Sequence, residues 1–301
     1  MRILLIAGGW SNEREVSLRG SHSIKESLQN LGHKVDFLDP ALEFHQLLPR
    51  ARRNDFAFIN LHGAPGEDGL IQTLLEHIGC PYQGSGPQGS FLALHKAAAK
   101  ELFRWSELPT PDWEYLPCKP DSDWKLKLSL PLVLKPNFGG SSLHISLIND
   151  YQELQAKMQT LWDSGWEVLL EQRIQGQEIT CAVLGLEPLP PVLIQPAQQS
   201  DFFDYYSKYT PQAAQEICPA PISQELTARI QHLALQAHNV LDLQGYSRTD
   251  FLVQDDQPYI LEVNTLPGMT TTSLLPQAAQ ARGYSFQALL ARLIELGLSK
   301  S

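Results

Sequence analysis

The sequence has little positive charge and no long basic run. Its 301 residues contain 23 Lys and Arg against 33 Asp and Glu, which gives a formal net charge of −10. An acidic surface repels nucleic-acid phosphates and anionic lipid headgroups, so neither nucleic acid nor membrane is an expected partner. A polyphosphate ligand would need a few basic residues gathered at one site.

Cysteine is also scarce. Cys80, Cys118, Cys181 and Cys218 lie far apart and form no Cys-x-x-Cys pair, which favours neither a zinc site nor a disulfide framework. Long apolar runs are missing as well, because the N-terminal run 3–7 ends at two glycines. It is too short for a signal peptide core or a membrane span. We interpret it as the first buried strand of a cytoplasmic enzyme.

The chain is longer than one compact core usually holds, which predicts two or three domains that share a cleft. Strands are expected at 3–7, 34–38 and 56–61, with helices at 17–31 and 69–78 between and after them. This alternation predicts a parallel α/β sheet. One helix is expected over 90–105, and the proline-rich segment 108–111 follows it as a candidate boundary.

The second part changes character. Strands at 132–136 and 168–172 flank a helix that Asp150 caps and that runs to about residue 162. Segments 179–184 and 189–194 predict an antiparallel hairpin, and 226–241 predicts an amphipathic helix. Between them, 198–221 has no periodicity, and a structureless loop of this length is usually functional.

Two further strands, 246–254 and 258–264, place polar side chains on one face. Period-two alternation puts Arg248 and Asp250 on the same face of the first strand. In the second strand it puts Glu262 on one face and Tyr259, Leu261 and Val263 on the other. Pairing the apolar faces sets Asp250 opposite Glu262 and Arg248 opposite Asn264. Two carboxylates and an amide suit Mg²⁺ held jointly with phosphate, although a solvated sheet face has the same composition.

Several segments in order carry a resemblance to a known family. They are 8–9 with 13–17, 61–63 with 66–69, 82–86, 134–136 with 140–142, 205–209, and 248–250 with 262–270. In this order they resemble the D-alanine–D-alanine ligases of the ATP-grasp superfamily, and the similarity runs to about Ile294. The turn that contains Gly268 follows a buried strand, where backbone N–H groups can stabilise an oxyanion.

The resemblance implies an α/β ATP-grasp fold. An N-terminal Rossmann-like parallel α/β domain (1–94) would precede two α+β domains that sandwich ATP, a central lid domain (95–178) and a C-terminal domain (179–301) with the metal and catalytic residues. The implied reaction joins two D-alanines for peptidoglycan synthesis, through an acyl phosphate that the second amine attacks. ATP and two Mg²⁺ ions, or Mn²⁺ in their place, would be required, and the enzyme would be a cytoplasmic homodimer.

The resemblance also implies residue roles. The metal ligands would be Asp250, Glu262 and Asn264. Contacts to ATP would come from Lys96, Lys135, Glu171, Ile174 and Glu178. The catalytic set would be Glu13, Ser141, Tyr209, Arg248 and the Gly268 backbone N–H. The amino-acid substrates would be bound by His62, Lys208, Ser273 and Leu274.

Three positions depart from the family pattern. His144 stands where the family has a glycine, Trp10 occupies a usually small position, and Thr249 replaces an apolar residue on the face predicted to be buried. A histidine lacks the access of glycine to positive φ, so the geometry of that loop is in question.

Other functions remain as alternatives. Segment 84–89 matches the dinucleotide fingerprint, which would fit an NAD-dependent dehydrogenase, but it lies in the middle of the first domain. A hydrolase function is disfavoured, because Ser141 does not lie in a Gly-x-Ser-x-Gly pattern. Within the superfamily, a ligase with another acceptor such as D-lactate is the nearer alternative. The pair Lys208-Tyr209 favours an acceptor that reacts through an amine. A non-catalytic binding function is also disfavoured, because Lys135, Arg248 and Asp250, which the family uses for catalysis, are all present.

Overall fold

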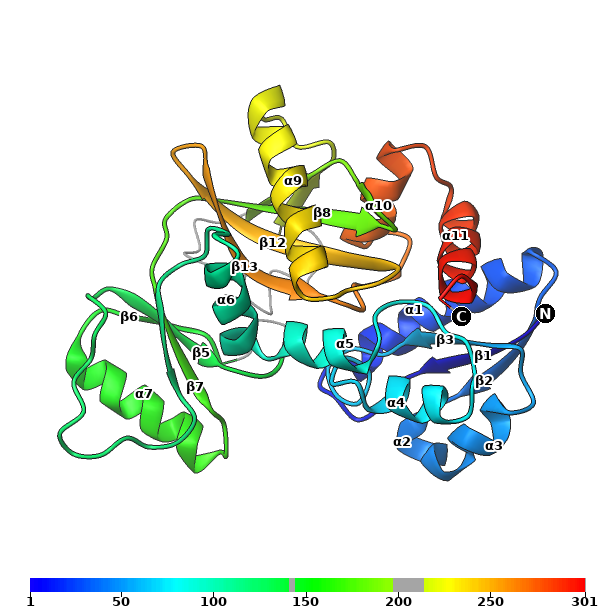
Figure 1. Cartoon of the computed structure of the whole chain (residues 1–301), viewed down its shortest axis with the longest axis horizontal. Helices are drawn as coiled ribbons and strands as arrows, with labels where there is room; N and C mark the ends of the chain where they lie inside the picture. The colour runs from blue at the N-terminus through cyan, green and yellow to red at the C-terminus, as the bar shows by residue number, and fades with distance from the viewer. Residues whose placement is uncertain (141–143, 197–213, 301) are drawn as a thin grey trace.

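The computed structural model describes residues 1–140, 144–196 and 214–300, which form three sheets with helices between and around them (Figure 1). The N-terminal sheet has the parallel order β2-β1-β3, from Lys34–Leu38, Arg2–Ala7 and Phe56–Asn60. Helices α1 (Arg14–Asn30), α4 (Leu70–His77) and the short α2 (Pro40–Glu43) and α3 (Leu47–Ala51) surround it, with a 3-10 turn, η1 (Phe44–Gln46), between the last two. The predicted strand–helix alternation is therefore confirmed.

The segment predicted as one helix over 90–105 is two helices. They are α5 (Pro87–Leu94) and α6 (Lys96–Trp105), and they meet at His95. The backbone of His95 leaves the helical region at φ −82° and ψ 88°, and its ring accepts a hydrogen bond from the Ala98 N–H. His95 is thus the N-cap of α6, which satisfies one of the free N–H groups of a new helix.

The second sheet is antiparallel and has the order β4-β7-β5-β6, from Trp113–Leu116, Val168–Gln172, Leu132–Pro136 and Ser146–Ile148. Helix α7 (Tyr151–Asp163) covers it, and its core includes Leu132, Leu154 and Leu170. The Asp150 carboxylate accepts a hydrogen bond from the Glu153 N–H, so the predicted cap is confirmed.

The C-terminal sheet has the order β11-β10-β8-β12-β13, with the short β9 (Glu187–Pro188) paired to β8. Its strands are Ala214–Ile217, Val192–Pro196, Gln177–Leu184, Tyr246–Gln254 and Gln257–Asn264, and α9 (Gln224–Val240) packs on one face (Figure 1). The antiparallel hairpin of β8 and β10 is confirmed. Strand β11 lies inside the segment predicted to be structureless, so that prediction is wrong at 214–217; residues 197–213 lie outside the described part.

The last two helices, α10 (Leu274–Ala281) and α11 (Phe286–Leu298), return to the N-terminal sheet. Leu289, Leu290 and Leu293 are fully buried in one cluster with Ile3 and Phe58. In Figure 1, α11 (red) lies beside α1 (blue), and the two are in contact. The first hydrophobic core therefore needs residues from both ends of the chain.

No helix among the described residues is long and apolar enough to cross a membrane.

Candidate active site

The hairpin of β12 and β13 supplies the centre of the site. Arg248 pairs with Asn264 and Asp250 pairs with Glu262, as alternation predicted. Beyond Asp250 the register shifts, because a β-bulge at Leu261 leaves Phe251 opposite Ile260. The prediction that Tyr259 and Leu261 share the buried face is therefore wrong.

The bulge changes which side chains enter the core. Ile260 is fully buried with Val263, whereas Tyr259 and Leu261 are only half-buried. An extra residue in one strand reverses the alternation on one side of it. The bulge lets both halves of β13 bury apolar side chains while Glu262 and Asn264 stay on the polar face.

Asp250 is held from three directions. Arg248 donates from Nε to Oδ1 and from Nη2 to Oδ2, both at 2.8 Å. Asn264 donates from Nδ2 to Oδ2 at 3.1 Å, and the Thr180 hydroxyl donates to Oδ1 at 2.7 Å. Only about 5% of Asp250 is exposed. This network fixes the carboxylate on the face that Glu262 and Asn264 share.

The donor set fits a hard divalent cation. Within 1–140, 144–196 and 214–300, no group of three or more His, Cys, Asp or Glu is arranged for a metal. Asp250 and Glu262 contribute two carboxylates, however, and Asn264 adds an amide whose nitrogen is already turned to Asp250. Such an incomplete oxygen set suits Mg²⁺, which usually retains water and shares its shell with a phosphate.

Three lysines reach the same region. Lys96 Nζ lies 3.4 Å from Glu262 Oε2 and donates to the Gly139 carbonyl. Lys135, at the end of β5, lies 2.7 Å from Glu171 Oε2, and Lys100 lies 2.8 Å from Glu171 Oε1. Burial lowers the pKa of Lys96, and the charge of Glu262 opposes that shift. The fold thus focuses positive charge where an acidic protein would otherwise repel phosphate.

Glu13 sits at the start of α1, on a loop that a partly buried ion pair holds. Asp39 follows β2, accepts the Gly9 and Ala41 N–H groups at 3.0 Å, and binds both Nη atoms of Arg14. Burial alone would raise the pKa of Asp39, but these hydrogen bonds outweigh it and lower the pKa. The Glu13 carboxylate lies close to Gly140, where an added Cβ would approach Oε2 to 3.3 Å.

His62 and Glu67 complete the cluster around Glu13. His62 Nδ1 donates to the Leu266 carbonyl at 3.0 Å, which leaves Nε2 as an acceptor. Burial lowers the pKa of His62, and Glu13 opposes the shift. Burial raises the pKa of Glu67 to about 8, and the charges of Glu13 and Glu262 add to the effect. Glu67 lies in the motif 66–69, and the sequence predicts no role for it. A motif does not show which of its side chains the fold will enclose.

The turn after β13 leads into α10. Ser273 is the N-cap of α10, but its hydroxyl accepts from the Thr270 N–H at 3.1 Å instead of capping the helix. The first N–H groups of α10, beginning at Leu274, therefore have no side-chain cap from Ser273, and a carboxylate suits that position. An added Cβ on Gly268 would lie 2.9 Å from the Ser273 hydroxyl, so a larger residue there would displace that hydroxyl.

The remaining predicted site residues either belong to the segment around β7 and β8 or lie outside the described residues. Ile174, between β7 and β8, and Glu178, in β8, are half-buried. Ser141, Lys208 and Tyr209 lie outside the described residues. Trp10 is about half exposed and packs edge-to-face on Phe44, with ring centroids 5.7 Å apart.

His144 adopts the conformation that the family pattern reserves for glycine. Its φ is +61°, and its ring centroid lies 6.2 Å from that of Trp166. Thr249 is fully buried as expected, and its hydroxyl has no hydrogen-bond partner within the described part of the chain. Each of these two departures therefore has a local energetic cost, from a positive φ at His144 and from the buried hydroxyl at Thr249.

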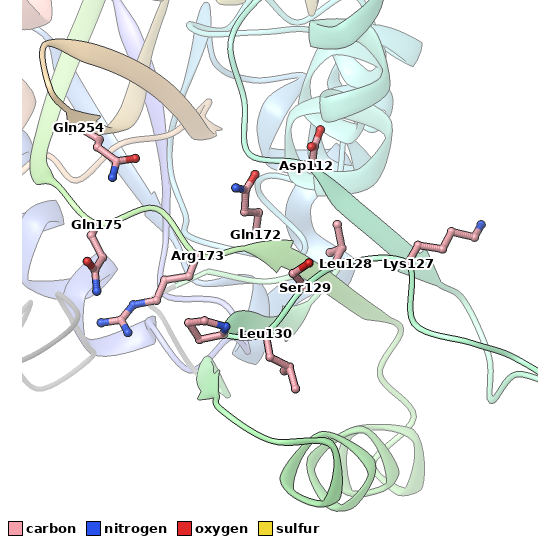
Figure 2. A pocket seen from close by; sticks show the side chains of 10 residues that line it. Asp112, Lys127, Leu128, Ser129, Leu130, Gln172, Arg173, Gln175 and Gln254 are labelled. Atoms are coloured by element: carbon pink, nitrogen blue, oxygen red, sulfur yellow. The ribbon is translucent and has the colours of Figure 1, made fainter.

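A separate pocket of about 480 Å³ lies at the junction of the central and C-terminal sheets (Figure 2). Figure 2 shows Gln172, Arg173 and Gln175 lining it from the segment around the end of β7, with Lys127 and Gln254 among the other lining residues. None of the residues assigned to substrate or metal lines this pocket. It is therefore distinct from the candidate active site.

The structure also explains the dinucleotide-like segment 84–89. An added Cβ on Gly89 would lie 2.8 Å from the Asp242 carbonyl, so this glycine permits close packing against the C-terminal part. This close packing accounts for the glycine without a dinucleotide.

Comparisons with known proteins agree with this geometry. The model of the D-ala D-ala ligase C-terminus matches residues 94–295. A D-alanine--D-alanine ligase of Desulfovibrio desulfuricans is 54% identical over 300 residues, covering 99% of this chain and 98% of its own length. That of Lawsonia intracellularis is 51% identical over 299 residues, with 99% and 98% covered.

Solved structures agree as well. D-alanine--D-Alanine Ligase from Bacillus anthracis complexed with ATP superposes with a TM-score of 0.89 and 35% identity, covering 100% of this chain and 98% of its own. Another structure from that organism gives 0.90 and 37%, with the same coverage. The dehydrogenase alternative is thereby wrong, and the chain belongs to the D-alanine–D-alanine ligase family, with the ATP-grasp fold.

Proposed function

We propose that this chain joins two D-alanine molecules into D-alanyl-D-alanine for cell-wall precursor synthesis, with conversion of ATP to ADP and phosphate. The observation that carries the proposal is the polar face of the β12–β13 hairpin. Arg248, Asp250, Glu262 and Asn264 converge there in a chain of the ligase family. Lys96 lies against the same face through Glu262.

A carboxylate is a poor electrophile, so the first D-alanine must be activated. Its ammonium pairs with Glu13, and His62 lies beside it. Lys96 and Lys135 neutralise the phosphates of ATP and align them with the D-alanine carboxylate, which attacks the γ-phosphorus. Positioning and charge neutralisation supply most of the acceleration in such transfers. The product is an acyl phosphate and ADP.

The second D-alanine is held by its carboxylate at the N-terminus of α10, near Ser273 and Leu274. Its neutral amine attacks the acyl carbon, and the negative charge that develops on the carbonyl oxygen faces Arg248 and the Gly268 N–H. Phosphate then leaves, and the peptide bond is complete. When bound by Asp250, Glu262 and Asn264, Mg²⁺ supplies further neutralisation of phosphate charge. A homodimer is the assembly that the family resemblance implies.

Phosphate release tests the proposal. Purified protein with Mg-ATP should release phosphate in the presence of D-alanine and form D-alanyl-D-alanine. L-Alanine and D-lactate should give little product. If D-lactate is the better acceptor, the chain is a ligase of another specificity; if no amino or hydroxy acid stimulates release, the proposal fails.

Glu262→Gln should lower kcat by about a hundredfold, because it removes one of the two carboxylates that would hold Mg²⁺ beside the transferring phosphate. The control is Glu295→Gln, which changes an exposed carboxylate paired to Arg292 on α11. Unfolding curves of the two variants should match wild type. Retained activity in Glu262→Gln would place the chemistry elsewhere.

A further inference from the structure

One buried lysine has no role in the reaction described above. Lys100 is only about 1% exposed, and its ammonium lies 2.8 Å from Glu171 Oε1. It also donates to the Thr110 hydroxyl at 2.6 Å and to the Pro111 carbonyl at 3.2 Å. A buried charge is costly unless it is paired and hydrogen-bonded, and Lys100 is both.

Lys100 shares its partner with Lys135. The two oxygens of Glu171 are divided between them, Oε1 to Lys100 and Oε2 to Lys135 at 2.7 Å. All three side chains are at least nine-tenths buried. Charges in such a setting interact strongly because water screens them little.

The net charge of this triad depends on Lys100. Two ammonium groups and one carboxylate leave one positive charge. Without Lys100, Glu171 and Lys135 would form a closed neutral pair, and little charge would remain for a phosphate. Burial lowers the pKa of Lys100 to about 8, with Glu171 opposing, so the group is mainly protonated at neutral pH.

Helix α6 makes the arrangement possible. Lys96 and Lys100 are four residues apart and project from the same face of the helix. Lys96 reaches the Gly139 carbonyl and Glu262, while Lys100 reaches Glu171. One helix thus supplies a cation to the phosphate site and a second cation to the carboxylate behind it.

We propose that Lys100 is a positioning residue that compensates the charge of Glu171, so that Lys135 keeps an uncompensated positive charge for the phosphates of ATP. The inference rests on the proposed function, which assigns Lys135 to ATP. It concerns affinity for phosphate and not for the adenosine part of the nucleotide.

Calorimetric titration with ATP and with adenosine separates these two parts. Lys100→Met should weaken ATP binding by about tenfold or more while adenosine affinity changes by about twofold at most. Lys100→Arg, which keeps the charge, should remain close to wild type. Adding Glu171→Gln to Lys100→Met restores a net charge of one and should recover the ratio of ATP to adenosine affinity.

Several results would overturn the inference. They are unchanged ATP affinity in Lys100→Met, equal losses for ATP and adenosine, or no recovery of the ratio in the double variant. If Lys100→Met does not fold, Glu171→Gln alone decides, because it leaves two uncompensated lysines and should raise the ATP-to-adenosine ratio above wild type. If wild type binds no ATP, the proposed function itself fails.

Discussion

Thr249 and Thr180 are neighbouring threonines with opposite hydrogen-bonding states. Among the described residues the buried Thr249 hydroxyl has no hydrogen-bond partner, while the single hydrogen of the Thr180 hydroxyl is shared between Asp250, at 2.7 Å, and the Thr249 carbonyl, at 3.1 Å. A buried polar group without a partner is destabilising, and an apolar group of the same shape removes that penalty. We expect Thr249→Val to raise the free energy of unfolding by about 1 kcal/mol.

Denaturant unfolding measures this difference. Thr180→Val is the matched control and should be destabilising, because it removes a hydroxyl that donates to Asp250 and leaves that buried carboxylate with one donor fewer. A loss of stability in Thr249→Val would mean that its hydroxyl has a partner in solution.

His238 is buried on α9, with Nδ1 2.8 Å from the Ser247 hydroxyl. Burial lowers its pKa to about 4, against about 6.5 in the unfolded chain. Between these values the unfolded state binds more protons, so stability falls as pH decreases. The contribution of His238 should drop by about 2 kcal/mol from pH 7.5 to pH 5.

His238→Gln removes this titration. Unfolding curves at the two pH values should therefore show a smaller pH dependence in the variant than in wild type. An equal dependence in both proteins would show that His238 does not titrate in this range.

At the scale of elements, alternation predicted the part of the hairpin that carries Arg248, Asp250, Glu262 and Asn264. It failed beyond Asp250, because a bulge depends on how both halves of β13 pack and not on a local pattern. The prediction of one helix over α5 and α6 is wrong for a related reason: both segments favour helix, and only the backbone at His95 separates them.

The Asp150 cap gives a test of the second sheet and its helix. Asp150→Ala removes the hydrogen bond to the Glu153 N–H, at 2.8 Å, and should lower stability by about 1 kcal/mol. Asp150→Ser keeps an acceptor and should lose much less. The two variants are compared by urea unfolding, and equal losses would show that the cap does not contribute.

For the whole molecule, the positions of ionic groups were the least predictable feature. Glu67, Asp39 and Lys100 are ordinary in the sequence. Yet Asp39 and Lys100 are buried against segments distant along the chain, and Glu67 is half-buried near Glu13 and Glu262. The family motifs located the site, but not the residues that hold its charges in place. Local spacing contains no information on which distant segment will cover a side chain.

The division into domains at residue 94 remains a prediction, and the first core provides its test. Leu289, Leu290 and Leu293 of α11 are buried against the N-terminal sheet. A fragment of residues 1–94 should therefore show no cooperative thermal unfolding by circular dichroism, whereas the whole chain should. Co-expression with 95–301 supplies α11 and should restore a folded complex. Cooperative unfolding of the fragment alone would contradict this expectation.

The return of α11 to the first sheet also affects how the chain is made. A ribosome synthesises β1 and β3 first and α11 long afterwards, so the part of the sheet that α11 covers stays exposed during most of translation. Domains usually fold as they emerge, and apolar surface that waits is open to aggregation. In this chain the N-terminal sheet is begun first and is among the last parts to be completed. We therefore expect chaperones to bind the nascent form of the N-terminal sheet.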